Sequence, residues 1–335
     1  MPYSPLASVA ATRAVLDGFG LSAKYALGQN FLVSDEVVGG ILELASLEPG
    51  DVVLEVGPGI GTLTNALLPR ASEVVAVEAD RDMERPLAET CAAYSERLAL
   101  VLGDALRVTP QQVGRALADL RGRGAGRPAA VPAGVSHHGG APTPVARAQK
   151  AGSVPAGPAM PAAPRELPNR WVSNLPYAVA ATLVLKWFES PDWAFLDDAV
   201  VMVQSEVADR ICAQPGSKIY GAYPLKLQLH ARVTGRFQVG ARSFFPAPHV
   251  DSAVVRIERR PAGERLPPEE ARACAAVIDA AFSQRRKTIR NAMSGAIFAT
   301  KERLDAAFDQ AGISPAARAE TLALDDFVRL ERALR

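Results

Sequence analysis

The sequence predicts an α/β protein in which a doubly wound, mostly parallel sheet is followed by a small all-α domain. Short apolar runs of strand character alternate with helical stretches over most of the chain. A Gly-rich turn follows the first buried run, and the strand signal stops at about Glu264. These three observations predict an α/β domain over residues 1–262 and a helical domain over residues 263–335.

The region before residue 121 is predicted to contain the first helices and strands of the sheet. Ser34 is a suitable N-cap for the first of these helices, and Pro49-Gly50 marks its end. The expected elements are a helix at 36–47, strands at 52–56, 73–78 and 98–102, and a helix at 62–68.

The region after residue 165 continues the alternation and then becomes purely helical. The expected elements are strands at 170–173, 199–203, 225–234 and 252–258, and a helix at 177–189. Residues 268–335 are rich in Ala, Arg, Asp and Leu at helical spacing, broken at Gly295, Gly312 and Pro315. We expect three or four helices there.

Residues 121–165 interrupt this pattern. They hold 8 Gly, 8 Pro and 12 Ala in 45 residues, and no aromatic residue. Such a composition cannot bury enough surface to offset the entropy of ordering, so we expect a disordered insertion in the α/β domain. His137 and His138 lie within it without further ligands nearby, so we expect no metal site.

The overall composition is that of a soluble globular enzyme. Of 335 residues, 48% are hydrophobic and 22% are charged, which excludes fibrous and wholly disordered proteins. The three cysteines, Cys91, Cys212 and Cys274, are far apart, which argues against disulfides and structural zinc. The separated cysteines also fit a reducing cytoplasm. We find no long apolar run or leader-like start, so we expect no membrane contact, and we expect a monomer.

The net charge of +1 conceals a strong asymmetry along the chain. Residues 1–120 carry 8 basic and 16 acidic side chains, whereas residues 200–335 carry 21 basic and 15 acidic ones. This distribution suggests an anionic partner on one part of the molecule.

The Gly-rich turn and two acidic residues after it predict a nucleoside-binding site. The turn reads GxGxG (57–61), and Thr62 stands where a dinucleotide-binding fingerprint requires glycine. Glu78 lies 21 residues beyond Gly57, the spacing of a carboxylate that binds ribose hydroxyls. Asp104 ends the next strand, where it can accept the exocyclic amine of adenine. A ribose and an adenine without a phosphate site indicate S-adenosylmethionine as the cofactor.

The tetrapeptide Asn174-Leu175-Pro176-Tyr177 predicts chemistry on an exocyclic amine. The side-chain carbonyl of Asn174 and the backbone carbonyl of Leu175 can accept N–H bonds from such an amine and hold its nitrogen in line with a methyl donor. Pro176 restrains the turn, and Tyr177 offers a face on which a base can stack.

These motifs resemble the small-subunit (16S) ribosomal RNA adenine dimethyltransferases of the KsgA/RsmA type. The resemblance runs from about Arg13 to the C-terminus, apart from the insertion. Besides the motifs above, the matching segments are KYALGQNFL (24–32), MVQSEVADRI (202–211), FFPAPHVDSAVV (244–255) and FSQRRKTIRN (282–291). The resemblance implies a Rossmann-like methyltransferase domain and dimethylation of N6 of two adjacent adenosines in the 3′-terminal hairpin loop of small-subunit RNA. It also implies a role in small-subunit maturation, with that RNA or a pre-30S particle as partner.

The resemblance also assigns roles to individual residues. Asn30, Leu32, Gly57, Glu78 and Asp104 are expected to bind the cofactor. The residues expected at the reacting base are Asn174, which also touches the cofactor, Leu175, Tyr177 and Phe244, the last two sandwiching the base.

A cationic cluster near the C-terminus is expected to bind RNA phosphates. We expect it on a single helix. Its members are Arg285, Arg286, Lys287 and Arg290.

Three other functions remain open at this point. A large-subunit (23S) adenine methyltransferase of the antibiotic-resistance (Erm) type shares the Gly-rich turn, the NLPY element and the F-x-P-x-P loop. A ribosome-assembly factor that acts mainly by binding would not need intact Glu78, Asp104 and NLPY. A nicotinamide dehydrogenase is disfavoured by Thr62.

Overall fold

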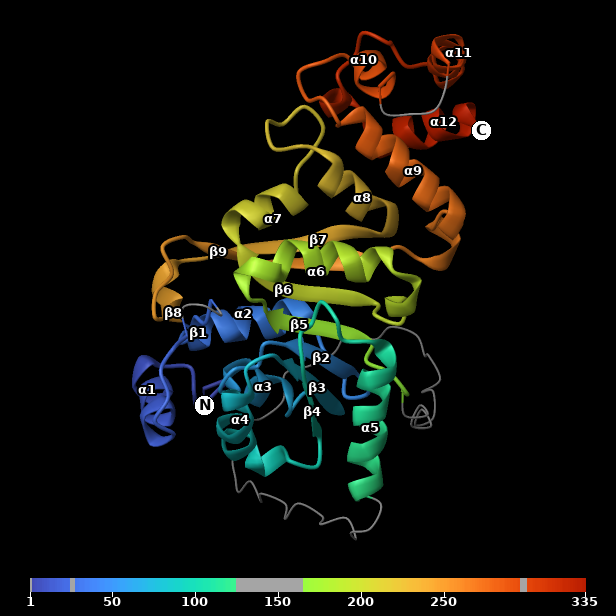
Figure 1. The fold of residues 1–335 in the computed structure, drawn as a ribbon. Helices are drawn as coiled ribbons and strands as arrows, with labels where there is room; N and C mark the ends of the chain where they lie inside the picture. The colour runs from blue at the N-terminus through green and yellow to red at the C-terminus, as the bar shows by residue number, and fades with distance from the viewer. Residues whose placement is uncertain (1, 25–27, 125–164, 296–299) are drawn as a thin grey trace, which may run out of the picture.

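The centre of the molecule is a seven-stranded sheet with strand order β4-β3-β2-β5-β6-β9-β7 (Figure 1). The computed structural model describes residues 2–24, 28–124, 165–295 and 300–335. Neighbouring strands from β4 to β6 are parallel, whereas β9 pairs antiparallel with both β6 and β7. The strands are β2 (Val52–Val56), β3 (Glu73–Glu78), β4 (Leu98–Leu102), β5 (Arg170–Asn174), β6 (Asp198–Gln204), β7 (Ala231–Val239) and β9 (Ser252–Arg259).

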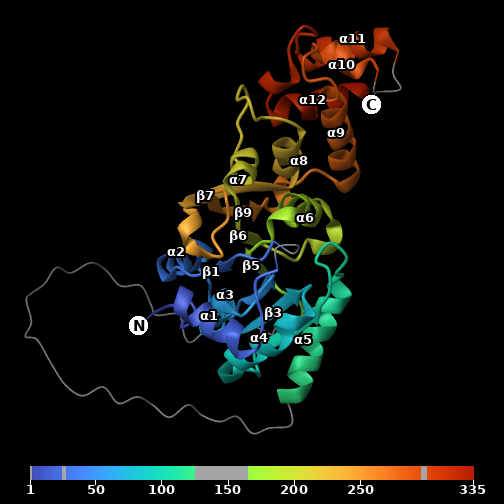
Figure 2. The ribbon, with the colours of Figure 1, turned by 60° about the vertical axis from the view of Figure 1, so that its left-hand side comes forward.

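The sheet is buried between two layers of helices, as expected for a doubly wound fold. All five residues of β2 are buried, with Leu54 in one hydrophobic cluster and Val53 in the other. Figure 2 shows the two layers on either side of the sheet. One layer comprises α2 (Asp35–Ala45), α3 (Thr62–Leu67) and α4 (Glu84–Thr90), and the other α5 (Pro110–Gly124), α6 (Tyr177–Glu189) and α7 (Ser205–Ile211).

For the helix expected at 36–47, the predicted N-cap is confirmed, but the helix ends earlier, at Ala45. The side chain of Ser34 accepts a hydrogen bond from the backbone N–H of Val37, and α2 begins at Asp35. Ser46 ends the helix in the left-handed conformation (φ 47°), shortly before Pro49.

The prediction of a strand over 225–234 is wrong for its first half. The chain there forms helix α8 (Ala222–His230) and enters β7 only at Ala231. Leu225, Leu227 and Leu229 alternate with polar residues as in a strand, but the helix buries them against two different partners. Leu227 packs on the core of the sheet, whereas Leu225 and Leu229 pack on the C-terminal helices.

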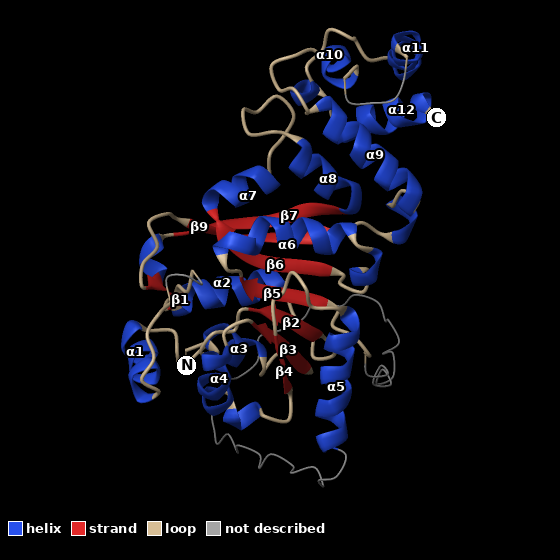
Figure 3. Cartoon of the chain, in the orientation of Figure 1, coloured by secondary structure: helices blue, strands red, loops and turns tan. Residues whose placement is uncertain are grey.

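The C-terminal part of the described chain is helical and stands beyond the β7 edge of the sheet (Figure 3). Its hydrophobic cluster also includes Tyr220, Leu225 and Leu229, so α8 joins the two parts. The helices are α9 (Pro268–Ala281), α10 (Ile289–Met293), α11 (Lys301–Ala311) and α12 (Leu324–Leu334).

Residues 121–124, expected at the start of a disordered insertion over 121–165, are helical instead. Helix α5 continues through Gly124, and residues 125–164, on which the prediction of disorder falls, lie outside the described residues. The sheet is continuous across this gap because β5 pairs in parallel with β2. Asn169 reinforces the junction by accepting the backbone N–H of Val52 at 2.9 Å.

Candidate functional site

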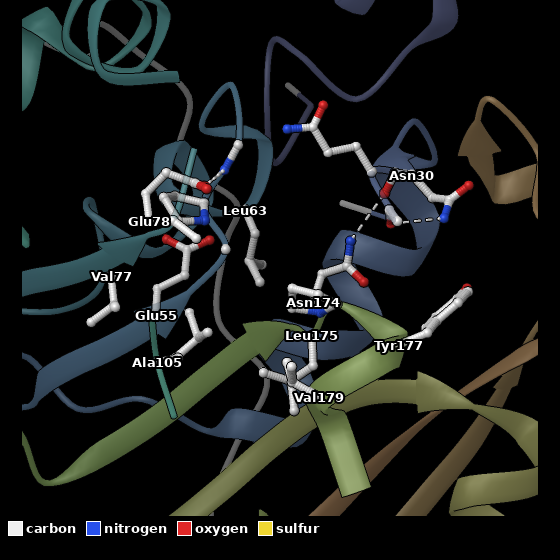
Figure 4. Close-up of a pocket in the computed structure, with 18 of the residues that line it drawn as sticks. Asn30, Glu55, Leu63, Val77, Glu78, Ala105, Asn174, Leu175, Tyr177 and Val179 are labelled. Carbon is white, nitrogen blue, oxygen red and sulfur yellow. Dashed lines mark hydrogen bonds between the residues drawn. The ribbon is translucent and has the colours of Figure 1, made fainter. Parts of the chain in front are cut away.

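A cavity of about 300 Å³ lies at the carboxyl ends of the central parallel strands (Figure 4). This is the edge at which doubly wound sheets bind ligands. Its walls are the Gly-rich turn after β2, the ends of β3 and β4, the NLPY segment after β5, and residues 28–32 of the N-terminal region. The last segment contains the short strand β1 (Phe31–Leu32), which pairs with β8 (Phe244–Phe245).

The glycines of the turn allow these walls to approach one another. Gly57, Gly59 and Gly61 all have positive φ, between 55° and 87°. A Cβ on Gly59 would meet the ring of Phe31 at 3.1 Å, and one on Gly57 would meet Pro176 at 3.4 Å. The turn therefore brings β1 and the NLPY segment to the same cavity.

Glu78 lies at the end of β3 with both carboxylate oxygens engaged. Its Oε2 accepts the backbone N–H of Gly59 at 3.1 Å, and its Oε1 accepts that of Asp80 at 2.8 Å. Burial raises the pKa of Glu78, and these backbone hydrogen bonds oppose the rise. They fix the carboxylate in the cavity wall, where it can accept hydroxyl groups.

Asp104 lines the same cavity at the end of β4 and is more accessible. Its side chain is 50% exposed, and its Oδ1 accepts the backbone N–H of Leu106 at 2.8 Å. The two acids that sequence spacing singled out are therefore brought to one cavity, on neighbouring strands.

Glu55 is a third acidic residue of the cavity, and sequence reasoning missed it. It is buried, and the hydroxyl of Thr64 donates to its Oε2 at 2.7 Å. Burial raises the pKa of Glu55 to about 8. Its signal in the sequence is a charged residue inside an otherwise apolar strand, VVLEV.

Asn174 ends β5 with a fixed side-chain amide. Its Nδ2 donates to the backbone carbonyl of Asn30 at 3.3 Å, which sets the orientation of the amide (Figure 4). Within the described part of the chain its side-chain oxygen accepts no hydrogen bond. Leu32 and Leu175 line the same cavity, and Leu175 is held by its backbone N–H, which donates to Met202 at 3.1 Å.

Tyr177 is the first residue of α6 and lines the same cavity, and its hydroxyl is fixed by a hydrogen bond. It lies 2.6 Å from the Oγ of Ser252, a buried residue at the start of β9. Burial raises the pKa of Tyr177, so the phenol stays protonated. Sequence reasoning missed Ser252, whose only signal is a polar residue at the start of an apolar strand.

The structure does not bring Phe244 to the cavity, contrary to the expected sandwich with Tyr177. Its ring is 3% exposed and packs in the hydrophobic cluster that contains Leu32 and Val254. Because side chains alternate along β8, Phe245 instead points to the opposite side, under the guanidinium of Arg13.

The expected cationic helix near the C-terminus is also corrected. Arg285, Arg286 and Lys287 lie exposed in the turn between α9 and α10, and only Arg290 is helical. Arg290 pairs with Asp305, 2.6 Å apart, so its charge is already compensated. Arg286 and Arg290 are four residues apart, a spacing that places two side chains on one face only within a continuous helix.

The described residues contain no cluster of side chains that could hold a metal ion. Among the helices of the same residues, none has the length and apolar composition of a membrane-spanning segment.

The cavity suits a cationic nucleoside ligand on its own geometry. Two carboxyl groups, Glu78 and Asp104, stand at adjacent strand ends, and the Gly-rich turn lets the cavity walls approach closely without a Cβ between them. These features fit S-adenosylmethionine, which carries a ribose, an adenine and positive charge.

Comparisons with known proteins agree with this assignment. Residues 20–335 match the sequence model of the ribosomal RNA adenine dimethylases. The ribosomal RNA small subunit methyltransferase A of Acidothermus cellulolyticus is 37% identical over 94% of this chain and 90% of its own length. That of Thermobifida fusca is 36% identical over 93% and 90%.

Solved structures show the same fold. A dimethyladenosine transferase from Plasmodium falciparum has a TM-score of 0.62 at 20% identity, covering 90% of this chain and 95% of its own. The 23S rRNA methyltransferase ErmE has a TM-score of 0.60 at 22% identity, covering 91% and 99%. With its sequence matched almost from end to end, this chain belongs to the ribosomal RNA adenine dimethylase family.

Proposed function

We propose that this protein dimethylates N6 of two adjacent adenosines in the 3′-terminal hairpin loop of small-subunit ribosomal RNA, with S-adenosylmethionine as methyl donor. The observation that carries the proposal is the amide of Asn174, held by Asn30 with its oxygen free at the cavity. An amine nitrogen needs such an acceptor to be held in line for attack. We infer that the protein acts as a monomer in the cytoplasm, on RNA or on a pre-30S particle.

The residues of the cavity would divide the work of binding. The carboxylate of Glu78 would accept hydrogen bonds from the ribose hydroxyls, and that of Asp104 would accept one from the adenine amine. Gly57 would lie beneath the cofactor. Asn30 and Leu32 would form the wall opposite. The donor supplies an electrophilic methyl group on its sulfonium. The fixed carboxylate of Glu78 is already ordered by two backbone N–H groups, so it needs little rearrangement on binding.

The target adenine would be flipped out of the RNA and held beside Asn174. The oxygen of Asn174 and the carbonyl of Leu175 would accept the two N–H groups of the exocyclic amine. Tyr177, fixed by Ser252, would give the base a stacking surface. No strong general base is needed, because the proton leaves after the nitrogen has become cationic. In the structure as described, the second stacking surface expected from Phe244 is covered.

The resistance-type alternative shares the fold, because both solved relatives have nearly equal TM-scores. The small-subunit names of the relatives at 37% and 36% identity support the proposed substrate instead.

The test is methylation of unmethylated ribosomal subunits with methyl-labelled S-adenosylmethionine, followed by mapping of the modified nucleotides. We expect label on two adjacent adenosines near the 3′ end of small-subunit RNA. Asn174→Ala should lower kcat by about 10²–10³-fold, as does the loss of a comparable positioning hydrogen bond elsewhere, while the circular dichroism spectrum is unchanged. Label confined to large-subunit RNA would support the resistance type. No label with tight small-subunit binding would support an assembly factor.

A further inference from the structure

The wall segment formed by residues 28–32 is anchored at its two ends in different ways. At its C-terminal end, β1 pairs with β8, and the N–H of Val33 donates to Ser243 at 2.8 Å. Among the residues that the structure describes, no strand pairs with its N-terminal end. The connection there is made by the side chain of Asp80, which follows β3 by two residues.

Asp80 uses both carboxylate oxygens for this connection. Its Oδ2 accepts the side-chain amide of Gln29 at 2.8 Å, and its Oδ1 accepts the ammonium group of Lys24 at 2.6 Å. Gln29 in turn accepts the backbone N–H of Lys24 at 2.9 Å through its Oε1. The three side chains therefore form a closed set of hydrogen bonds that joins the N-terminal region to the end of β3.

The carboxylate of Asp80 is buried, although its partner Lys24 is partly exposed. The side chain of Asp80 is 5% exposed, whereas that of Asp82, which also contacts Lys24 at 2.6 Å, is 57% exposed. Charge-assisted hydrogen bonds shielded from water are stronger and better defined in geometry than exposed pairs, which contribute little.

Asn30, the residue after Gln29, contacts the side-chain amide of Asn174. The backbone carbonyl of Asn30 accepts the Nδ2 of Asn174 and so decides which side of that amide presents its oxygen (Figure 4). In addition, the backbone N–H of Asp80 donates to Glu78. One residue is thus connected to the ribose-binding carboxylate through its backbone and to the amide of Asn174 through its side chain.

We propose that Asp80 is a positioning residue for methyl transfer: its carboxylate holds Gln29 and Lys24 and thereby fixes the Asn30 carbonyl that orients the amide of Asn174. This inference rests on the function proposed above. Because the bond to Glu78 comes from the backbone of Asp80, side-chain changes should leave the ribose-binding carboxylate in place and lower turnover more than cofactor affinity.

The test compares Gln29→Ala and Asp80→Ala with the matched control Asp82→Ala. For each protein we would measure kcat and KM on unmethylated small subunits with labelled S-adenosylmethionine. Affinity for S-adenosylhomocysteine would be measured by calorimetry. Gln29→Ala and Asp80→Ala should each lower kcat about tenfold with affinity within threefold of the wild type, as loss of a positioning hydrogen bond predicts. Asp82→Ala should stay within twofold in both quantities.

Asp80 is buried, so Gln29→Ala keeps the test valid if Asp80→Ala fails to fold. A wild-type kcat in Gln29→Ala overturns the inference, and so does a loss confined to cofactor affinity. The double variant Gln29→Ala/Asp80→Ala should be no slower than the slower single variant, and additive losses contradict a common path. An inactive wild type overturns the proposed function and this inference with it.

Discussion

At the scale of single residues, Glu55 shows how the cavity differs from the ordinary interior of a sheet. The neighbouring valines of β2 are buried and apolar, yet this position carries a carboxyl group with the hydroxyl of Thr64 as its hydrogen-bond donor. Its pKa of about 8 means that the group is mostly protonated at neutral pH. A buried neutral acid costs far less than a buried unpaired charge.

This protonation predicts a specific pH dependence of stability. In the unfolded chain the group titrates near its ordinary value of 4.5, and in the folded chain near 8. The folded state therefore binds one more proton between these values, and its stability falls as pH rises through that window, by up to about 1.4 kcal/mol per pH unit. Below about pH 4.5 the stabilisation is fully present.

Glu55→Gln keeps the hydrogen bond to Thr64 and removes the titration. Urea unfolding of both proteins at pH 5, 6, 7 and 8 should show the wild type losing stability relative to the variant as pH rises. If the free energies of unfolding of the two proteins changed in parallel from pH 5 to 8, Glu55 would be ionised over this range in the folded state, and burial would not raise its pKa.

At the scale of elements, the Gly-rich turn depends on a backbone that only glycine adopts easily. Gly61 precedes α3 with φ 87°, and a Cβ there would lie 3.0 Å from both the sulfur of Cys91 and the side chain of Leu87 on α4. Both strain and overlap oppose a side chain at this position.

Gly61→Ala should therefore lower the free energy of unfolding by about 2–3 kcal/mol, since left-handed backbone alone costs about 1–2 kcal/mol in a residue with a Cβ. Gly50→Ala is the control, because Gly50 has no positive φ and a Cβ there would meet no atom within 4 Å. Chemical denaturation of both variants checks this expectation. Equal losses would show that the cost is not specific to the turn.

The elements that could be predicted from sequence are those whose local pattern and burial agree. Residues 52–56, 73–78 and 98–102 form strands with the expected ends. β2 and β3 are buried on both faces, which requires apolar runs, and the edge strand β4 is apolar although only partly buried. The prediction of a strand fails for residues 225–230 because their leucines face two separate cores, which local periodicity does not reveal. Pro224 in the first turn of α8 is compatible with a helix start, where its missing N–H has no helical partner.

The candidate site divides in the same way. Glu78 and Asn174 end strands of a parallel sheet, and Asp104 follows another, so their positions in the sequence place them at one edge. The contacts of Asp80 with Gln29, and of Tyr177 with Ser252, join segments that are remote along the chain. No local pattern encodes such pairs, because they depend on how β1 and β9 pack against the site.

At the scale of the whole molecule, the domain boundary that we propose between residues 262 and 263 does not divide the hydrophobic core. Residues from both sides of it pack in one hydrophobic cluster. Helix α8, which precedes it, packs Leu225 and Leu229 against the C-terminal helices. Tyr220 strengthens the contact, because its hydroxyl donates to the carbonyl of Leu322 at 3.1 Å. The turn that carries Arg285 is held against the same region by a hydrogen bond to the carbonyl of Lys218.

The exposed cations of that turn predict how RNA binding depends on salt. Within the described chain, Arg286 and Lys287 are exposed and pair with no carboxylate, whereas Arg290 is paired with Asp305. When an unpaired cation contacts an RNA phosphate, a counterion is released from the RNA. Each such contact adds about 0.7–0.9 to the magnitude of the slope of log affinity against log salt concentration. Arg286→Ala/Lys287→Ala should therefore weaken binding of a 3′-terminal small-subunit hairpin and reduce that slope by about 1.5.

Fluorescence anisotropy between 50 and 300 mM KCl measures both quantities, with Arg290→Ala as the comparison. Removing Arg290 leaves Asp305 without its partner, so the expected effect is a lower melting temperature with an unchanged salt slope. If the double variant kept the wild-type slope, the phosphate contacts would have to come from elsewhere on the molecule. If Arg290→Ala lowered the slope as much as the double variant, its pairing with Asp305 would have to open on RNA binding.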